Sequence, residues 1–228
     1  VPFMMHLAET KEEVDIIRSR YGLRPVHYLE KIGVLGGKSA AVHCVWLDDS
    51  EMDVLAASGT GVCHCPESNM KLASGMARIP ELLKRGVAVG LGTDGCASNN
   101  DLDMLLELDT MAKLHKVSTM NPTVMDAAAA LQIATTGGAR VLGLQHLIGS
   151  VEPGKCADLI VLDMKQAHLT PLYHLYSQIV YACRGSDVRD VIIDGKMVMR
   201  NRRLLTLDVQ KIMDDVREIA DRVKITRS

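Results

Sequence analysis

The chain has 228 residues, of which 47% are apolar and 24% charged, and its formal net charge is −2. This composition is typical of a globular protein, and the near-neutral charge favours neither nucleic acid nor an anionic membrane as a partner. One Trp and one Phe provide no stacking surface for single strands. No apolar run approaches the roughly 20 residues of a membrane span. The six cysteines lie mostly in apolar segments, which indicates reduced, buried thiols in a cytoplasmic protein.

Short apolar segments alternate with helical segments from residue 2 to residue 91. Strands are predicted at 2–7, 39–45, 61–65 and 87–91, and helices at 10–21, 25–32, 50–57 and 78–84. Thr10 is the expected N-cap of the first helix, and Asp49 or Ser50 that of the third. The alternation predicts a parallel α/β fold, either a doubly wound sheet or a barrel. A complete (β/α)8 barrel takes about 250 residues, so four such units would form half of one.

The later part of the chain changes character. Helices are predicted at 102–116, 123–135 and 139–144, with Gly137-Gly138 stopping the second. A turn-rich run at 148–155 precedes a strand at 157–163, a hairpin at 188–199 around Asp194-Gly195, and a closing helix at 207–223. The predicted domains are therefore a barrel portion at 1–147, a β portion at 148–205 and a C-terminal helix at 206–228.

Polar side chains end three of the four predicted parallel strands: His6 with Glu9, then His43, and Asp94 between glycines. In parallel barrels chemistry is placed at this edge. A carboxylate where a buried strand ends is costly to desolvate unless a metal or another cation meets it. Each residue alone has an ordinary explanation, namely a turn Asp, a satisfied His or a charge at a helix start. Together they favour a metal site, with Asp94 as ligand and base and His6 as the second ligand. Zinc hydrolases use three or four protein ligands, so the sequence supplies fewer than such a site needs.

Other polar residues leave alternatives open. Cys63-His64-Cys65 has the composition of a zinc site, but alternation along a strand places the two thiols on one face and the imidazole on the other. Asn69 and Lys71 follow in a predicted loop and would either contact a substrate or shape the loop. Four further histidines have no partner in the sequence and receive no role: His115, His146, His168 and His174.

Longer motifs carry a family resemblance. The runs 6–10 (HLAET), 42–47 (VHCVWL), 64–75 (HCPESNMKLASG) and 92–100 (GTDGCASNN) resemble the amidohydrolase superfamily. The branch is the one that contains 5-methylthioadenosine/S-adenosylhomocysteine deaminases and chlorohydrolase-like proteins. The run 148–161 (IGSVEPGKCADLIV) is similar to that superfamily's return from the barrel to a small β-sandwich. The resemblance implies an α/β fold that is the second half, strands 5–8, of a (β/α)8 TIM barrel with part of the β-sandwich.

The resemblance also implies a set of site residues. His6 and Asp94 would bind one zinc or another divalent ion, and Glu9 would bind the purine ring and carry a proton. His43 would hold the attacking water or the tetrahedral intermediate, and Ser98 would contact the substrate together with Glu9 and Asp94. The family's other two metal ligands are a His-x-His pair on strand one, and no His-x-His occurs in this sequence. We therefore expect the chain to be the C-terminal portion of a longer barrel.

The activity implied is zinc-dependent deamination of adenosine-type thioethers, S-adenosylhomocysteine or 5-methylthioadenosine, to an inosine-type product and ammonia. This activity would require the missing amino-terminal half. The expected binding partner is its substrate, a small purine nucleoside. Guanine deamination or s-triazine chlorohydrolysis is the alternative within the superfamily. An inactive chain that only self-associates is the alternative of another class. Unpaired strands at the edges of half a barrel would also favour a homo-oligomer.

Overall fold

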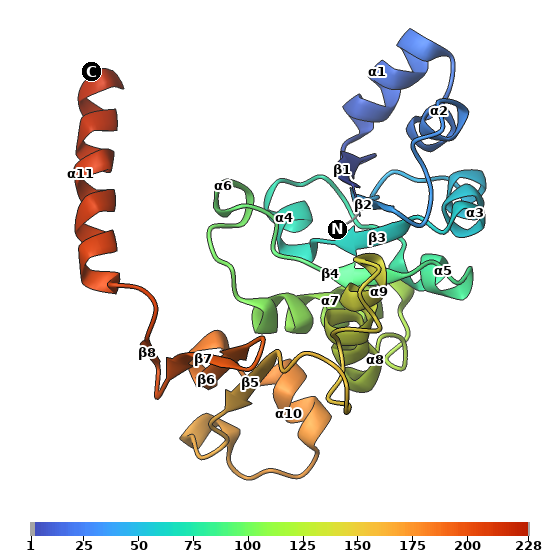
Figure 1. Cartoon of the computed structure of the whole chain (residues 1–228). Coiled ribbons are helices and arrows are strands. Elements are labelled where there is room, and N and C mark those ends of the chain that lie inside the picture. The colour runs from blue at the N-terminus through green and yellow to red at the C-terminus, as the bar shows by residue number, and fades with distance from the viewer. Residues whose placement is uncertain (1–2, 228) are drawn as a thin grey trace. The chain divides into compact units, whose positions relative to one another are not determined.

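The computed structural model describes residues 3–227, with side chains to residue 223, so the predicted strand residue Pro2 and the terminal Ser228 lie outside it. The chain divides into two compact units, and each is described by itself (Figure 1). The first unit comprises Val1–Lys155 and Lys165–Gly185, and the second comprises Cys156–Met164 and Ser186–Ser228. Among the described helices, none is both long and apolar enough to cross a membrane.

A four-stranded parallel sheet forms the centre of the first unit. Its strands are β1 (Phe3–Leu7), β2 (Ser39–His43), β3 (Gly61–His64) and β4 (Val89–Leu91), and they pair in chain order. A doubly wound sheet would reverse its strand order at a switch point, whereas consecutive order suits a section of a barrel wall. The fold is therefore parallel α/β here, and the numbering of these strands as 5–8 of eight remains a proposal.

Helices follow each strand of the first unit. They are α1 (Lys11–Tyr21), α2 (Pro25–Lys31), α3 (Asp49–Ser58), α4 (Pro66–Lys71), α5 (Ile79–Lys84), α6 (Cys96–Asn99), α7 (Met104–Thr119), α8 (Ala127–Gln132), η1 (Ile133–Gly137), α9 (Gly138–Val141), η2 (Ala167–Leu169) and α10 (Leu175–Tyr181). Thr10 caps α1 as predicted, accepting a hydrogen bond from the Glu13 amide at 3.1 Å. The cap of α3 is Asp48 rather than Asp49 or Ser50, because Asp48 and Glu51 form a reciprocal capping box.

Two further predictions for this unit are wrong. Asn69 and Lys71 were expected in a loop but lie on α4, which Pro66 starts at its first turn. Gly137-Gly138 was expected to stop a helix, yet η1 runs through Gly137 into α9. The physical reason is packing, because a Cβ at Gly137 would overlap the carbonyl oxygen of Val89 on β4. Glycine is present here for close approach of helix and strand, not for a turn.

The second unit holds an antiparallel sheet and a long helix. The sheet has the order β5 (Leu159–Leu162), β6 (Val188–Ile193), β7 (Lys196–Arg200) and β8 (Arg203–Leu204), and 3₁₀ turn η3 (Gly185–Asp187) precedes β6. The predicted hairpin turns at Asp194-Gly195, both at positive φ. Residues 165–185 belong to the first unit, since α10 packs on α7 and α8. The domain division at residues 147 and 205 remains a prediction.

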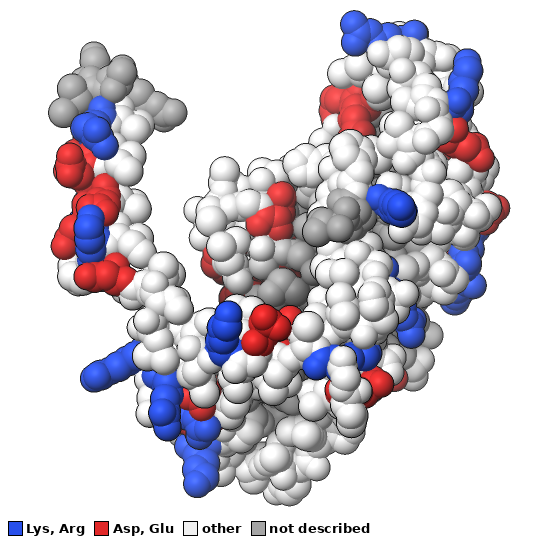
Figure 2. All heavy atoms as spheres, in the orientation of Figure 1, with Lys and Arg blue, Asp and Glu red and all other residues white. Residues whose placement is uncertain are grey.

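Helix α11 (Val209–Arg227) is amphipathic and has an uncovered apolar stripe. Acidic and basic side chains are interspersed along it (Figure 2), with ion pairs Lys211–Asp215 at 2.8 Å and Arg217–Asp214 at 2.7 Å. Four of its exposed apolar side chains follow a three–four spacing: Ile212, Val216, Ile219 and Val223. This stripe could bury further apolar area against another surface.

Candidate functional site

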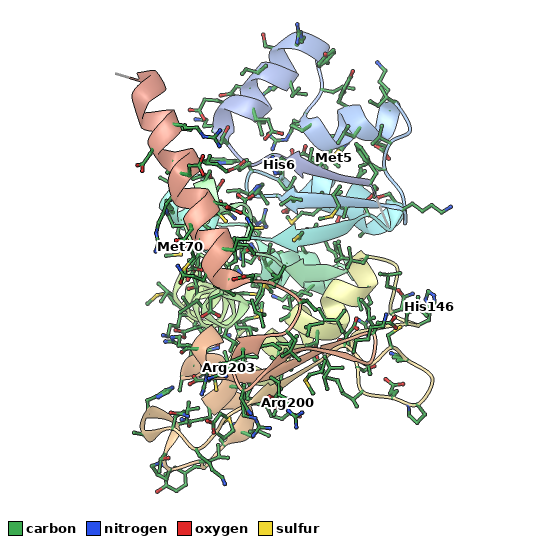
Figure 3. All side chains as sticks on the ribbon, turned by 60° about the vertical axis from the view of Figure 1, so that its left-hand side comes forward. Met5, His6, Met70, His146, Arg200 and Arg203 are labelled. Atoms are coloured by element: carbon green, nitrogen blue, oxygen red, sulfur yellow. The ribbon has the colours of Figure 1, made fainter. Side chains whose placement is uncertain are left out.

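The fold brings three predicted site residues together at one edge of the parallel sheet. His6 lies near the end of β1 (Figure 3), His43 ends β2, and Asp94 follows β4. One potential ligand atom from each of the three lies within 4.8 Å of the others. The imidazole centroids of His6 and His43 are 5.1 Å apart. Residues far apart in the sequence thus form one cluster, which is the arrangement that a metal site requires.

His43 is the buried centre of this cluster. Its side chain is fully buried, and its Nε2 atom lies 3.6 Å from Glu9 Oε2 and 4.0 Å from Asp94 Oδ2. That nitrogen has no hydrogen-bond partner among the described residues. His43 and Asp94 both adopt left-handed backbone conformations, with φ of 73° and 60°. Such strain in non-glycine residues tends to gather at functional sites.

Three side chains from residues 68–74 form hydrogen bonds with Asp94, Glu9 and His43. The Ser68 hydroxyl donates to Asp94 Oδ2 at 2.7 Å, and the Ser74 hydroxyl donates to Glu9 Oε1 at 3.1 Å. Asn69 Oδ1 lies 2.8 Å from His43 Nδ1. Sequence reasoning missed Ser68 and Ser74 and left Asn69 open. The available signal was the adjacent small polar pair Ser68-Asn69, four residues after the strand that ends at His64.

Asp94 is held as a carboxylate. Burial alone would raise its pKa, but hydrogen bonds from Ser68, from the Gly95 amide and from Ser98, with the nearby His43, keep the pKa below its ordinary value. Ser98, predicted to contact a substrate, therefore lies against Asp94. An ionised Asp94 can take a cation or accept a proton.

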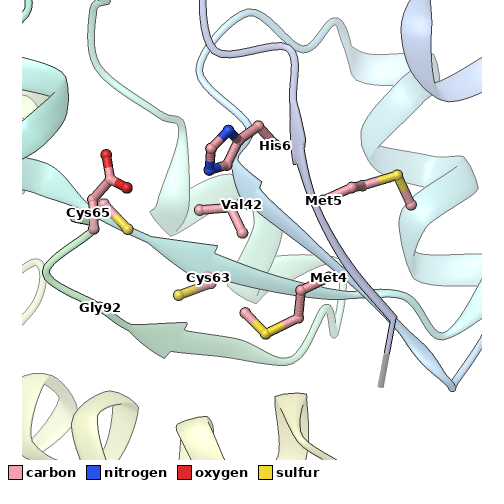
Figure 4. Close-up of a pocket in the computed structure, with 8 residues that line it drawn as sticks. Met4, Met5, His6, Val42, Cys63, Cys65 and Gly92 are labelled. Carbon is pink, nitrogen blue, oxygen red and sulfur yellow. The ribbon is translucent and has the colours of Figure 1, made fainter. Parts of the chain in front are cut away.

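The cluster opens on a pocket of about 460 Å³, lined in part by His6, Asp94, Cys63 and Cys65 (Figure 4). The two thiols share the pocket face, as strand alternation predicts. His64 points the other way and is buried, with its Nε2 atom 3.3 Å from Nε2 of His115. Within the described part of the chain, the cysteines do not join a cluster of three close ligands. In the Cys63-His64-Cys65 run, the two thiols thus line the pocket while the imidazole is buried against His115.

The donors at the sheet edge fit a divalent zinc ion. Two imidazole nitrogens and a carboxylate are common zinc ligands. The unpartnered, buried Nε2 of His43 is an atom whose desolvation calls for a cation, a proton or a water molecule. His6, exposed at the pocket, and Asp94 are the residues that would hold the ion.

Lys71 lies outside the pocket. Its ammonium group contacts the Ala97 carbonyl oxygen and the Asn100 side chain, so it ties α4 to the loop after β4. The expectation of buried thiols also needs correction, since Cys96 and Cys156 are exposed. Cys96 begins α6 and Cys156 lies in a turn-rich connection, where side chains face outward.

Glu107 is a buried carboxyl that sequence reasoning did not single out. It sits on α7 and accepts hydrogen bonds from Asn99 Nδ2 at 2.6 Å and from the Glu67 amide at 3.2 Å. Glu107 thereby anchors α6, which carries Ser98, and the start of α4, which carries Ser68 and Asn69. Burial is the main cause that raises the pKa of Glu107 to about 8.

This raised pKa predicts a pH-dependent stability. Between its ordinary value of 4.5 and about 8, folded Glu107 holds a proton that the unfolded chain has lost. Its contribution to stability is therefore complete below pH 4.5 and decreases as the pH rises to about 8. Urea unfolding midpoints across this range should fall more steeply for the wild type than for Glu107→Gln, which cannot ionise. Equal slopes would contradict the raised pKa.

Comparison with known proteins identifies the class. The Amidohydrolase family profile matches residues 1–198, so the chain belongs to the amidohydrolase family. It is 54% identical over 224 residues to a 5-methylthioadenosine/S-adenosylhomocysteine deaminase of Syntrophobacter fumaroxidans, covering 98% of this chain and 51% of that protein. It is 48% identical over 223 residues to a 5'-deoxyadenosine deaminase of Methanosarcina barkeri, with coverage of 98% and 51%.

A solved structure shows the same fold. The crystal structure of an adenosine deaminase from Xanthomonas campestris, with bound zinc, superposes with a TM-score of 0.96 at 41% identity. The match covers 99% of this chain and 51% of that one. The chain thus spans about half the length of the curated relatives it matches. The family resemblance inferred from the motifs is confirmed.

Proposed function

We propose that this chain supplies one part of the active site of a zinc-dependent deaminase for adenosine-type nucleosides, S-adenosylhomocysteine and 5-methylthioadenosine above all. The observation that carries the proposal is the cluster of His6, His43 and Asp94, with Glu9 beside it. Its relatives' names support the substrate class, since they are called deaminases of thioadenosines and of 5'-deoxyadenosine. The remaining ligands would come from the His-x-His half that relatives of twice this length have room for.

The chemistry of the side chains gives each residue of the cluster a different role in hydrolytic deamination. When bound, zinc supplies Lewis-acid activation of water near neutral pH. Asp94, ionised and hydrogen-bonded, accepts the proton that the attacking water gives up. Glu9 carries a proton to a ring nitrogen of the purine, as a positioned general acid. Water adds at C6 and ammonia leaves, which gives an inosine-type product. His43, between the two carboxylates, holds the water.

Glu9, Asp94 and Ser98 are the proposed substrate contacts. Ser98 is partly buried on α6 and bonds to Asp94, so it can line the mouth of the pocket. Guanine deamination and s-triazine chlorohydrolysis are the alternative activities that the superfamily resemblance implies. The adenosine-type names of relatives near half identity favour the nucleoside.

A chimera tests the activity. This chain would replace the corresponding half of the Syntrophobacter relative, and ammonia release would be measured with S-adenosylhomocysteine, 5-methylthioadenosine, 5'-deoxyadenosine, adenosine, guanine and an s-triazine. We expect turnover of the adenosine-type compounds, one zinc ion per site, and no turnover by this chain alone. Selective turnover of guanine or the triazine would overturn the substrate class, with the unaltered relative as the control for assembly.

Self-association without catalysis is the second candidate. The exposed stripe of α11 favours it, because four apolar side chains there are uncovered in the described structure. A folded chimera that binds no zinc and turns over no compound would favour this reading. Sedimentation of the chain at several concentrations would then show whether homo-oligomers form.

A further inference from the structure

Two neighbouring residues of α4 reach two different members of the cluster. Ser68 donates to Asp94, while Asn69 Oδ1 lies 2.8 Å from Nδ1 of His43. The side chains of Asn69 and His43 are both fully buried. A buried contact of this length between an amide and an imidazole is a hydrogen bond in which only one partner can supply the proton.

The backbone of Asn69 is fixed on both sides. Its amide donates to the Cys65 carbonyl oxygen at 3.0 Å, and its own carbonyl oxygen accepts from the Ser74 amide at 2.9 Å. Pro66 starts the helix with a restricted φ. Asn has a short side chain, so a fixed backbone leaves its carboxamide little freedom. The carboxamide is thus placed by α4 independently of anything bound in the pocket.

A carboxamide oxygen accepts hydrogen bonds and cannot donate them. With Asn69 Oδ1 oriented toward it, Nδ1 of His43 is the nitrogen that carries the proton. A neutral imidazole has one N–H, so Nε2 is left with a free lone pair. This is the buried nitrogen without a partner in the described structure, and it faces the carboxylates of Glu9 and Asp94.

We propose that Asn69 is a positioning residue that fixes neutral His43 as its Nδ1–H tautomer, so that Nε2 is presented to the pocket as an acceptor. A lone pair that faces two carboxylates is favourable only when a cation or a proton donor lies between them. The arrangement therefore reserves the space among His43, Glu9 and Asp94 for such a species. Rotating the carboxamide by half a turn would instead place Asn69 Nδ2, which has no partner among the described residues, against Nδ1 of His43 and would direct Nε2–H at the carboxylates. The experiment distinguishes these two arrangements.

The consequence for catalysis rests on the proposed function, whereas the tautomer does not. In a deaminase, an acceptor at Nε2 would hold the attacking water through one of the water's own protons. His43 would then help to orient the water toward the purine, while Asp94 receives the proton. The tautomer can be measured on the full chain without metal and without any assay of activity.

The experiment is a long-range ¹H–¹⁵N correlation spectrum of the full chain, labelled with ¹⁵N-histidine, chelator-treated and held at about pH 8.5, well above the ordinary histidine pKa. The His43→Gln variant assigns the resonances. In the wild type we expect His43 to show a protonated Nδ1 and an unprotonated Nε2. Asn69→Ala should lose this pattern and shift His43 toward the Nε2–H form.

Two matched variants complete the design. Asn69→Asp keeps an acceptor of the same length and should retain Nδ1–H, while Met70→Ala changes the adjacent, exposed residue of α4 and should leave the His43 pattern unaltered. A protonated Nε2 in the wild type would overturn the proposal, and so would an unchanged pattern in a folded Asn69→Ala. Should Asn69→Ala fail to fold, the wild-type and Asn69→Asp spectra still decide the outcome. Failure of the chimera to deaminate would leave these spectra, and hence the tautomer, unaffected.

Discussion

Asp94→Asn in the chimera should abolish zinc binding and lower the rate of deamination by about 10⁴-fold, the upper end for loss of a positioned acid–base group. Asp94 combines two roles, since it is both a proposed ligand and the proposed base. Its carboxylate is held ionised by hydrogen bonds that include one from Ser68 at 2.7 Å. The amide of Asn lacks the charge for either role. Zinc content per chain and ammonia release measure the two effects separately.

Two comparisons sharpen this result. Glu9→Gln should keep zinc but slow deamination by about 10²–10⁴-fold, because Glu9 carries a proton and is not a proposed ligand. Asp53→Asn makes the same chemical change on the exposed face of α3, where Asp53 pairs with Arg85 at 2.7 Å, and should alter neither quantity. Full activity with Asp94→Asn would refute the site assignment. Zinc loss with Glu9→Gln would reassign Glu9 as a ligand.

Gly137→Ala should destabilise the first unit by about 3 kcal/mol, the upper end of the usual range for overpacking. A Cβ at this position would overlap the Val89 carbonyl oxygen. Since that oxygen belongs to the β4 backbone, it cannot rotate away as a side chain could. The helix η1 would have to move off the sheet. A decrease in the urea unfolding midpoint measures the effect.

The adjacent glycine is the control. At Gly138 the nearest atom to a new Cβ is the Ile133 carbonyl oxygen at 4.0 Å, so the site has room. Both glycines have helical φ, −64° at Gly137 and −56° at Gly138. Gly138→Ala should therefore stabilise the chain by about 0.5–1 kcal/mol, as alanine does within a helix. Similar midpoints for the two variants would show that η1 does not approach β4 so closely.

Local patterns made much of the fold predictable. The four parallel strands were located by short apolar runs, and Thr10 caps the first helix as predicted. Strand ends also pointed to His6, His43 and Asp94, because parallel strands deliver their last residues to one edge. Failures occurred where a residue's role depends on a distant neighbour. Gly137 was interpreted as a helix stop because nothing in its own segment reveals β4.

The sequence by itself determined the parallel α/β pattern, the family and the residues at the strand ends, since all of these are encoded in periodicity and contiguous motifs. Only the tertiary structure decided what surrounds them. Asn69 meets His43 across 26 positions, and Ser74 meets Glu9 across 65. Glu107 is buried beneath α4 and α6 although it lies on α7, a helix with both apolar and charged residues. Such contacts depend on chain closure and packing, which no local run of residues specifies.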